Sequence, residues 1–200
     1  MGNAMNGDRK FVFCEGKDDA AVIRSLAEAL GLAVHIEHYG GKNNLANFLH
    51  GLAKRPEFAQ NRVAAMAILR DADEGSDAAF ASVRDALRQS EFAAPEISGT
   101  FMESNPRIGV FIVGVEGKGM IEDLCLQSVA DQPEFACVAD YFRCIAQHST
   151  RKDFKSKARV RVWMASHTDW EYHAGKAAEA GYWPWESPAF DALKNFLRAL

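Results

Sequence analysis

Four short apolar runs, each followed by an amphipathic segment of helical length, constrain the fold of this chain more than any other feature of its sequence. The apolar runs occupy residues 10–14, 34–38, 63–69 and 108–113, and the helical segments occupy residues 20–30, 44–54, 76–89 and 120–129. Strands that alternate with helices form a parallel sheet, because each helix returns the chain to the start of the next strand through a right-handed crossover. The run 63–69 is apolar throughout, which is typical of a strand covered on both faces. The sequence therefore predicts an α/β fold.

Residues that start and stop helices support these boundaries. Asp18 suits the N-cap of the first helix, and Gly31 stands where the residue after a helix C-terminus is expected. Gly40 and Gly41 close the second strand. Pro56 is expected to stop the second helix, because helices usually end before a proline.

The sequence changes character at residue 134, after which helical patterns continue without a convincing strand. The expected helices are residues 134–148, 154–167 and 188–200. We therefore expect a flexible leader at residues 1–9, an α/β domain at residues 10–133 and a helical C-terminal extension at residues 134–200, packed on that domain. All four tryptophans lie in the extension: Trp163, Trp170, Trp183 and Trp185. We expect them to pack the extension onto the sheet, and a surface for a partner or for base stacking is the alternative.

The charge limits how this protein could meet nucleic acid. A formal net charge of −4 argues against a protein that coats nucleic acid with its whole surface, but not against an enzyme with a local acidic site. Basic residues do gather in one stretch of the extension: Arg151, Lys152, Lys155, Lys157, Arg159 and Arg161. Either a solvated helix face or a ridge that contacts phosphates explains this run.

Cysteine usage and hydropathy indicate a cytoplasmic protein without membrane contact. The cysteines form no C-x-x-C pair and lie in apolar stretches, as buried reduced thiols do: Cys14, Cys125, Cys137 and Cys144. His35 and His38 lie three residues apart in a predicted strand, hence on opposite faces, and are interpreted as structural. No apolar run approaches the roughly 20 residues of a spanning helix, and the first ten residues are too polar for a signal peptide.

Three carboxylates follow two of the predicted strands directly. Glu15 ends the first apolar run, and Asp71 and Asp73 follow the third. Ligands of open α/β sheets bind at the carboxyl ends of the strands, where the strand order reverses. Asp71 and Asp73 can point to one side if the backbone there stays extended. Hard oxygen ligands favour Mg²⁺ or Mn²⁺, so the pattern predicts a divalent-cation site. The alternative is that both aspartates cap the following helix and Glu15 is a turn residue.

These residues resemble the TOPRIM (topoisomerase–primase) domain. The resemblance lies in Phe-Val-Phe-Cys-Glu15-Gly-Lys-Asp-Asp19 and in Ala-Ile-Leu-Arg-Asp71-Ala-Asp73. It implies a three-layer, Rossmann-like parallel sheet in the order 2-1-3-4, with a Glu after strand one and a D-x-D after strand three. The spacing of Glu15 and Asp19 resembles the overcoming-lysogenization-defect (OLD) nucleases, which implies that Asp19 assists the metal site. The segments 40–45 and 117–124 are similar to small stand-alone TOPRIM-like proteins without an established function.

The resemblance also implies roles for particular residues. The metal ligands would be Glu15, Asp19, Asp71 and Asp73, with Glu15 also acting in proton transfer. Lys17, at the start of the first helix, would meet a substrate phosphate and counts with Glu15 as a catalytic candidate. The phosphate-binding candidates are Gly16, Lys42 and Lys118. Glu122 and Asp123 either extend the site to a second metal or complement the dipole of the helix that they begin.

The function expected from the resemblance is Mg²⁺- or Mn²⁺-dependent phosphodiester chemistry on nucleic acid, most plausibly hydrolysis. A different class of function is the alternative: a non-catalytic module that binds a metal and a nucleotide or a nucleic-acid end and serves a protein partner. A basic groove leading to Glu15 would favour the nuclease, and an acidic, closed surface would favour the module. Receiver domains and haloacid-dehalogenase phosphatases fit less well, because their acidic residues follow the strands in a different arrangement.

Overall fold

The computed structural model describes residues 9–150, 154–167 and 173–200 of this chain. The strands in the described part are β1 (Arg9–Cys14), β2 (His35–His38), β3 (Val63–Asp71), β4 (Thr100–Met102) and β5 (Arg107–Val113). The helices up to the end of the predicted α/β domain are α1 (Lys17–Ala29), α2 (Leu45–Ala53), α3 (Pro56–Ala59), α4 (Ser76–Gln89) and α5 (Ile121–Ser128), with a 3₁₀ turn η1 at Lys42–Asn44. Beyond them lie α6 (Pro133–His148), α7 (Ser156–Ala165), α8 (Ala174–Glu179), the 3₁₀ turn η2 (Pro188–Phe190) and α9 (Asp191–Arg198).

The strands form one sheet in the order β2-β1-β3-β5-β4. The pairs β1–β2, β1–β3 and β3–β5 are parallel, so these four strands end at the same edge of the sheet. The predicted α/β class is therefore confirmed. The short strand β4, which the sequence analysis did not predict, pairs antiparallel with β5 at the margin of the sheet.

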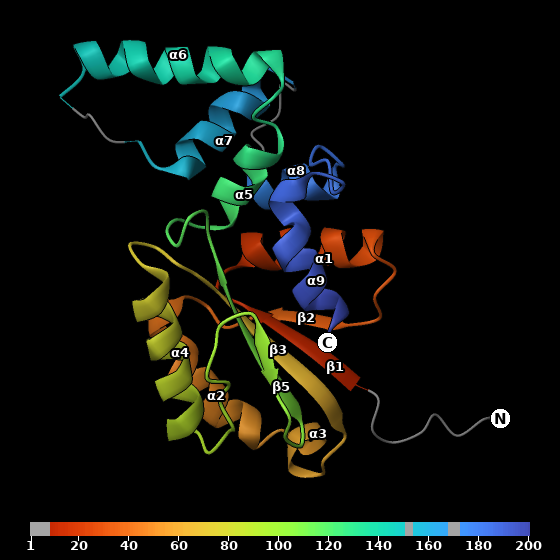
Figure 1. The fold of residues 1–200 in the computed structure, drawn as a ribbon. Coiled ribbons are helices and arrows are strands. Elements are labelled where there is room, and N and C mark those ends of the chain that lie inside the picture. Colours follow the sequence, from red (N-terminus) through yellow and green to blue (C-terminus); the bar gives the residue numbers. More distant parts are fainter. Residues whose placement is uncertain (1–8, 151–153, 168–172) are drawn as a thin grey trace.

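Helices cover both faces of the sheet, and the alternation of side chains along the strands gives each face its own core. On β1, Val12 and Cys14 pack into the cluster beneath α1 and the extension, whereas Phe11 and Phe13 pack into the cluster beneath α2, α3 and α4. Figure 1 shows α1, α8 and α9 on one side of the sheet and α2 and α4 on the other. The architecture thus has three layers.

The extension and the sheet share one core. Phe196 of α9 stacks on Phe101 of β4, with ring centroids 4.8 Å apart. Trp163 of α7 and Trp183 are 1% and 2% exposed and stack on each other, so the prediction that they pack inward is confirmed. Trp170 lies outside the described residues. Helix α8 lies against α1, and a Cβ added to Gly175 would come within 2.9 Å of the Cβ of Ala21.

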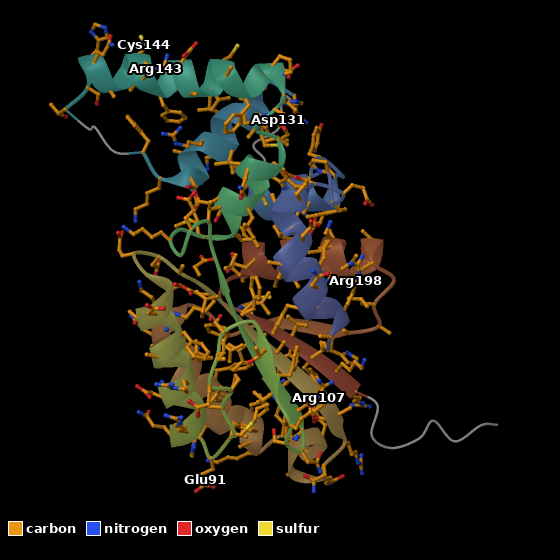
Figure 2. All side chains as sticks on the ribbon, in the orientation of Figure 1. Glu91, Arg107, Asp131, Arg143, Cys144 and Arg198 are labelled. Carbon is orange, nitrogen blue, oxygen red and sulfur yellow. The ribbon has the colours of Figure 1, made fainter. Side chains whose placement is uncertain are left out.

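Several local predictions differ from the structure. Gly16, not Asp18, is the N-cap of α1, and Pro56 begins the short helix α3 instead of only ending α2, because proline fits the first turn of a helix. Cys14 and Cys125 are buried as expected, but Cys137 and Cys144 are exposed on α6. Figure 2 shows Cys144 on the side of α6 that faces away from the rest of the protein. In the part of the chain that the structure describes, no helix is both long and apolar enough to cross a bilayer.

Candidate functional site

A small cavity lies where β1 and β3 end, and three of the predicted carboxylates line it. Glu15, Asp19 and Asp71 share its wall with Arg70 and with apolar side chains of the core. Its volume of about 10 Å³ is close to that of a single water molecule. The parallel pairing of β1 with β3 places Glu15 and Asp71 at this edge. The structure therefore brings together residues that lie far apart in the sequence.

Asp71 is the most deeply placed of these acids. It is the last residue of β3, 9% exposed, and its Oδ1 accepts a hydrogen bond of 3.1 Å from the backbone N–H of Ile121 at the start of α5. Burial raises the pKa of Asp71 to about 9, with further contributions from the charges of Asp19, Glu122 and Glu15. Asp71 thus caps α5, not the helix that follows it in the sequence. An ionised Asp71 needs a positive charge nearby.

Helices α1 and α5 begin in the same way. The Oδ2 atom of Asp19 accepts a hydrogen bond of 2.6 Å from the N–H of Gly16, and the Oδ2 atom of Asp123 accepts one of 2.8 Å from the N–H of Met120. Ser156 of α7 donates a further hydrogen bond to Asp123. Asp123 therefore caps a helix, which is the alternative to its role at a second metal. The N–H of Gly16, a phosphate-binding candidate, already donates its hydrogen bond to Asp19. Burial raises the pKa of Asp19.

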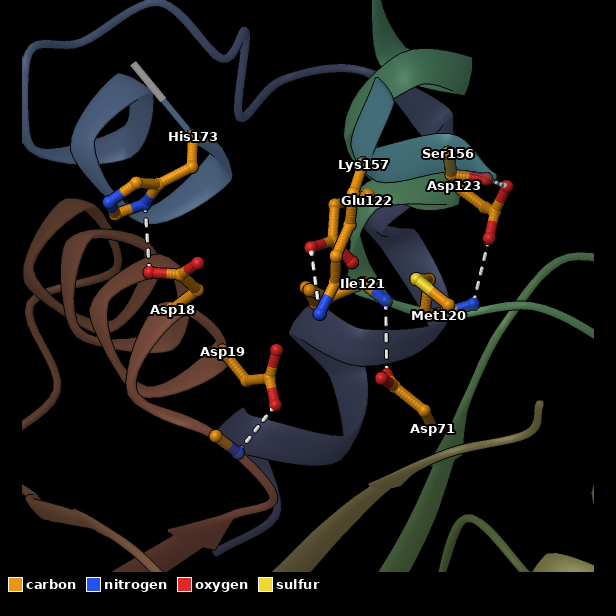
Figure 3. A network of polar contacts seen from close by, with 11 residues as sticks. Asp18, Asp19, Asp71, Met120, Ile121, Glu122, Asp123, Ser156, Lys157 and His173 are labelled. Atoms are coloured by element: carbon orange, nitrogen blue, oxygen red, sulfur yellow. Dashed lines mark hydrogen bonds and ion pairs between the residues drawn. The ribbon is translucent and has the colours of Figure 1, made fainter. Parts of the chain in front are cut away.

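Glu122 belongs to the acidic cluster, unlike its neighbour Asp123. Its side chain is 2% exposed, and its Oε1 lies 3.7 Å from Nζ of Lys157 on α7. Its Oε2 is buried without a hydrogen-bond partner among the described residues, as is Oε2 of Glu15. Burial is the main cause that raises the pKa of Glu122 to about 7. We call Glu15, Asp19, Asp71 and Glu122 the acidic cluster; Figure 3 shows three of its members, with Lys157 beside them.

Asp73 departs from the predicted geometry. Its φ of +50° turns the backbone out of the extended conformation after β3, and its N–H and C=O both pair with the backbone of Gly119. The two aspartates of the D-x-D therefore do not continue one extended strand. The carboxylate of Asp73 forms an ion pair of 2.7 Å with Nζ of Lys42. Its charge still contributes to the raised pKa of Glu15, after burial and the charge of Asp19.

The three candidate lysines differ in their surroundings. Lys42 lies closest to the acids, because its N–H also donates a hydrogen bond of 3.3 Å to Oε1 of Glu15. Lys17 is exposed at the first position of α1. Lys118 is exposed in a tight turn, where its backbone pairs with that of Val115. Of the three, only Lys42 has a described contact with a predicted metal ligand.

The basic run in the extension does not form one uniform face. Lys157 lies beside the acidic cluster, and Arg159 lies over the ring of Phe142 on α6, 5.2 Å from its centroid. Lys155, the N-cap of α7, and Arg161 within that helix are both exposed. Arg151 and Lys152 lie outside the described residues. Sequence reasoning grouped these residues by spacing alone and did not predict that one of them meets the acids at the ends of the strands.

The donor atoms fit a hard divalent cation in chemistry but not yet in geometry. Carboxylate oxygens are the ligands that Mg²⁺ and Mn²⁺ prefer. Two of those in the acidic cluster, on Glu15 and Glu122, are buried with no partner in the part of the chain that the structure describes. Within the described ranges, however, no three His, Cys, Asp or Glu side chains stand close enough together to hold an ion as they are. Binding would require these side chains to turn toward a common point.

Fold and site together define a three-layer α/β protein with a buried acidic cluster at the carboxyl ends of its parallel strands. The chain belongs to a family described as a protein of unknown function (DUF3226), whose model matches residues 9–200. No curated protein and no solved structure matches this chain.

Proposed function

We propose that this protein binds Mg²⁺ or Mn²⁺ at the acidic cluster, in the manner of TOPRIM domains, and uses the ion in phosphodiester hydrolysis on nucleic acid. One observation carries the proposal: four carboxylates from β1, α1, β3 and α5 gather at the ends of the strands, with pKa values raised by burial. A buried group of acids costs folding free energy through desolvation and mutual repulsion unless a counter-ion or protonation offsets that cost. A bound divalent ion would offset that cost.

Each residue has a role in this proposal. A bound Mg²⁺ would supply positive charge to polarise a phosphate oxygen. Glu15, Asp19 and Asp71 would hold the ion, and the Oε2 of Glu15, which has no hydrogen-bond partner among the described residues, is available for a proton. Lys42 is the candidate that pairs with a phosphate, because its ammonium lies beside Asp73 and its backbone N–H bonds to Glu15. Lys17, at the N-terminus of α1, is a second candidate for the same task.

One observation favours the alternative of a non-catalytic module that binds a metal and a nucleotide or nucleic-acid end. The cavity is small, and among the described residues that line it three are acidic and one, Arg70, is basic. The same acids would then bind the ion without cleavage, and a protein partner would complete the surface for nucleic acid. Both functions require binding of a divalent cation. Cleavage of nucleic acid distinguishes the nuclease from the non-catalytic module.

The experiment compares metal binding with cleavage in the same variants. Titration calorimetry with MnCl₂ should show binding by the wild-type protein and none by Asp71→Asn. Wild-type protein with Mn²⁺ should nick or degrade labelled DNA or RNA, and Glu15→Gln should lose at least about 10²-fold in rate. Binding without cleavage of either nucleic acid would support the module. Cleavage that persists unchanged in both variants would show that its source is a contaminant or another site.

A further inference from the structure

The extension brings one cation to the acidic cluster from outside the α/β domain. Lys157 is the second residue of α7, and its Nζ lies 3.7 Å from Oε1 of Glu122. Figure 3 shows its ammonium at the point that the side chains of Glu122, Asp19 and Asp71 surround. The charges of Asp19 and Asp71, after that of Glu122, hold the pKa of Lys157 above its usual value. Lys157 thus acts electrostatically on the same acids that the proposed metal would use.

The fold positions Lys157 by contacts that do not involve its own side chain. Ser156, next to it, donates a hydrogen bond to Asp123 of α5. On the inner side of α7, Val160, Trp163 and Met164 are each 1% exposed. Because Ser156 and Trp163 anchor this helix, its backbone keeps Lys157 within reach of the acidic cluster.

Lys157 neither contacts every oxygen of the acidic cluster nor balances its charge, so a second cation can still bind there. The Oε2 atom of Glu122 is buried and has no partner in the described part of the chain, although Oε1 has the lysine. One ammonium brings one positive charge to four carboxylates. A divalent ion brings two and can accept several oxygens at once. The lysine side chain is 58% exposed, so it can leave for solvent at little cost.

We propose that Lys157 is a built-in counter-cation, which occupies the acidic cluster in the absence of metal and which a divalent ion must displace in order to bind. This inference rests on the proposed metal site and adds its regulation: the extension competes with the ion. Like charges at such short range repel, so the ammonium and the ion exclude each other from the cluster.

The test measures Mn²⁺ affinity by calorimetry in three forms of the full chain. Lys157→Met should bind Mn²⁺ about tenfold more tightly than the wild type, because the competing charge is gone. Lys155→Met is the matched control: it removes an equal charge two residues away, from an exposed position, and should leave the affinity nearly unchanged. Equal or weaker binding by Lys157→Met than by the wild type would overturn the inference while leaving the metal site intact. No binding by any form would overturn the metal site itself, and this inference with it.

A second readout follows the lysine itself. Wild-type protein is acylated briefly with an amine-reactive ester, with and without MgCl₂, and labelling at Lys157 is measured by peptide mass spectrometry. Displacement predicts that Mg²⁺ raises labelling of Lys157 severalfold, with Lys155 as the internal standard. Lower labelling of Lys157 in Mg²⁺ would contradict displacement. Because the measurement uses the wild-type protein, it does not depend on whether a variant folds.

Discussion

Lys42 Nζ and Asp73 Oδ2 lie 2.7 Å apart, and the backbone N–H of the same lysine donates a hydrogen bond to Glu15 of the acidic cluster. The ion pair joins the residue after β2 and its glycine turn to the residue that leaves β3, and both side chains are substantially exposed. Another lysine, Lys157, faces Glu122 of the same cluster. Two lysines thus contact the acids, and they differ in what they are expected to do.

Lys42 is expected to contact phosphate. Lys42→Ala should leave the melting temperature nearly unchanged, because an exposed ion pair adds little to stability. It should weaken the binding of labelled single-stranded DNA or RNA in fluorescence anisotropy, and the difference from wild type should shrink as salt is raised. Lys54→Ala, on an exposed lysine at the end of α2, is the control. Equal losses in both variants would assign the effect to overall charge.

Mg²⁺ is expected to stabilise the folded protein through Asp71. A ligand that binds only the native state raises the melting temperature by mass action, here by roughly 5 °C or more when its concentration is about 100 times Kd. Asp71→Asn should abolish that rise. It should also stabilise the metal-free protein near neutral pH, because the carboxyl of Asp71 must take up a proton when it is buried beside Asp19 and Glu122, whereas an amide need not. Differential scanning fluorimetry checks both points, and equal Mg²⁺ responses in the two proteins would count against the site.

The stability of the metal-free protein is expected to fall as the pH rises. In the unfolded chain Asp71 has an ordinary pKa of about 4, whereas in the folded protein the pKa is about 9. The folded state holds this proton more tightly, so the stability from Asp71 is fully present below about pH 4 and is lost as the pH rises toward 9. Glu122, with a pKa of about 7, acts in the same direction. Urea titrations at pH 6 and pH 8.5 should show a decrease that is smaller in Asp71→Asn.

The close packing of α8 on α1 is expected to depend on Gly175. An added Cβ would lie 2.9 Å from the Cβ of Ala21 and 3.1 Å from the backbone oxygen of Asp18, so Gly175→Ala should cost about 1–3 kcal/mol. Gly51, in α2, has nothing within 4 Å of an added Cβ. Gly51→Ala should therefore stabilise the protein by about 0.5–1 kcal/mol. Chemical denaturation of both variants tests the contrast, and two changes of the same sign would contradict it.

Removal of the extension is expected to leave an incomplete core. Residues of β1 and α1, such as Val12, Ile23 and Leu26, share one cluster with Val138, Trp163 and Phe190 of the extension. A protein that ends at residue 133 should therefore be insoluble or should bind a hydrophobic dye without a cooperative melting transition. A soluble, cooperatively folding fragment would make the extension a separable binding element.

The elements that could be predicted from the sequence are those whose pattern is long enough to show a period. The predicted helices at 76–89 and 134–148 agree with the structure almost residue for residue, because apolar side chains recur along one face. Strand β4 and helix α8 were missed. Thr100–Met102 has three residues and becomes a strand through its pairing with β5, and α8 is built largely from alanine and glycine. The formation of β4 and of α8 therefore depends on tertiary contacts and not on a pattern in the local sequence.

Within the candidate site, the sequence was enough to predict which acidic residues lie near each other, but not how their side chains are oriented. The rule that parallel strands end together was enough to place Glu15 near Asp71. The φ of +50° at Asp73 could not be predicted, since that turn depends on pairing with Gly119. The different surroundings of Glu122 and Asp123 could not be predicted either. Adjacent residues of a helix point in different directions, and which of the two faces the other acids depends on where the helix begins. Lys157 reaches the cluster through the docking of α7 alone.

The contact between Gly175 and α1 has a consequence for the order of folding. Helix α1 follows the first strand, whereas α8, which packs on it, comes from a part of the sequence far downstream. Helix α9, near the end of the described chain, packs over Phe101 on the same side of the sheet. Contacts between such distant segments form late and slow the folding of a chain. During synthesis, the acids on α1 therefore stay in water until the downstream helices emerge. We therefore expect the electrostatic cost of enclosing them to arise when these helices dock, the stage at which Lys157 of α7 can also reach them.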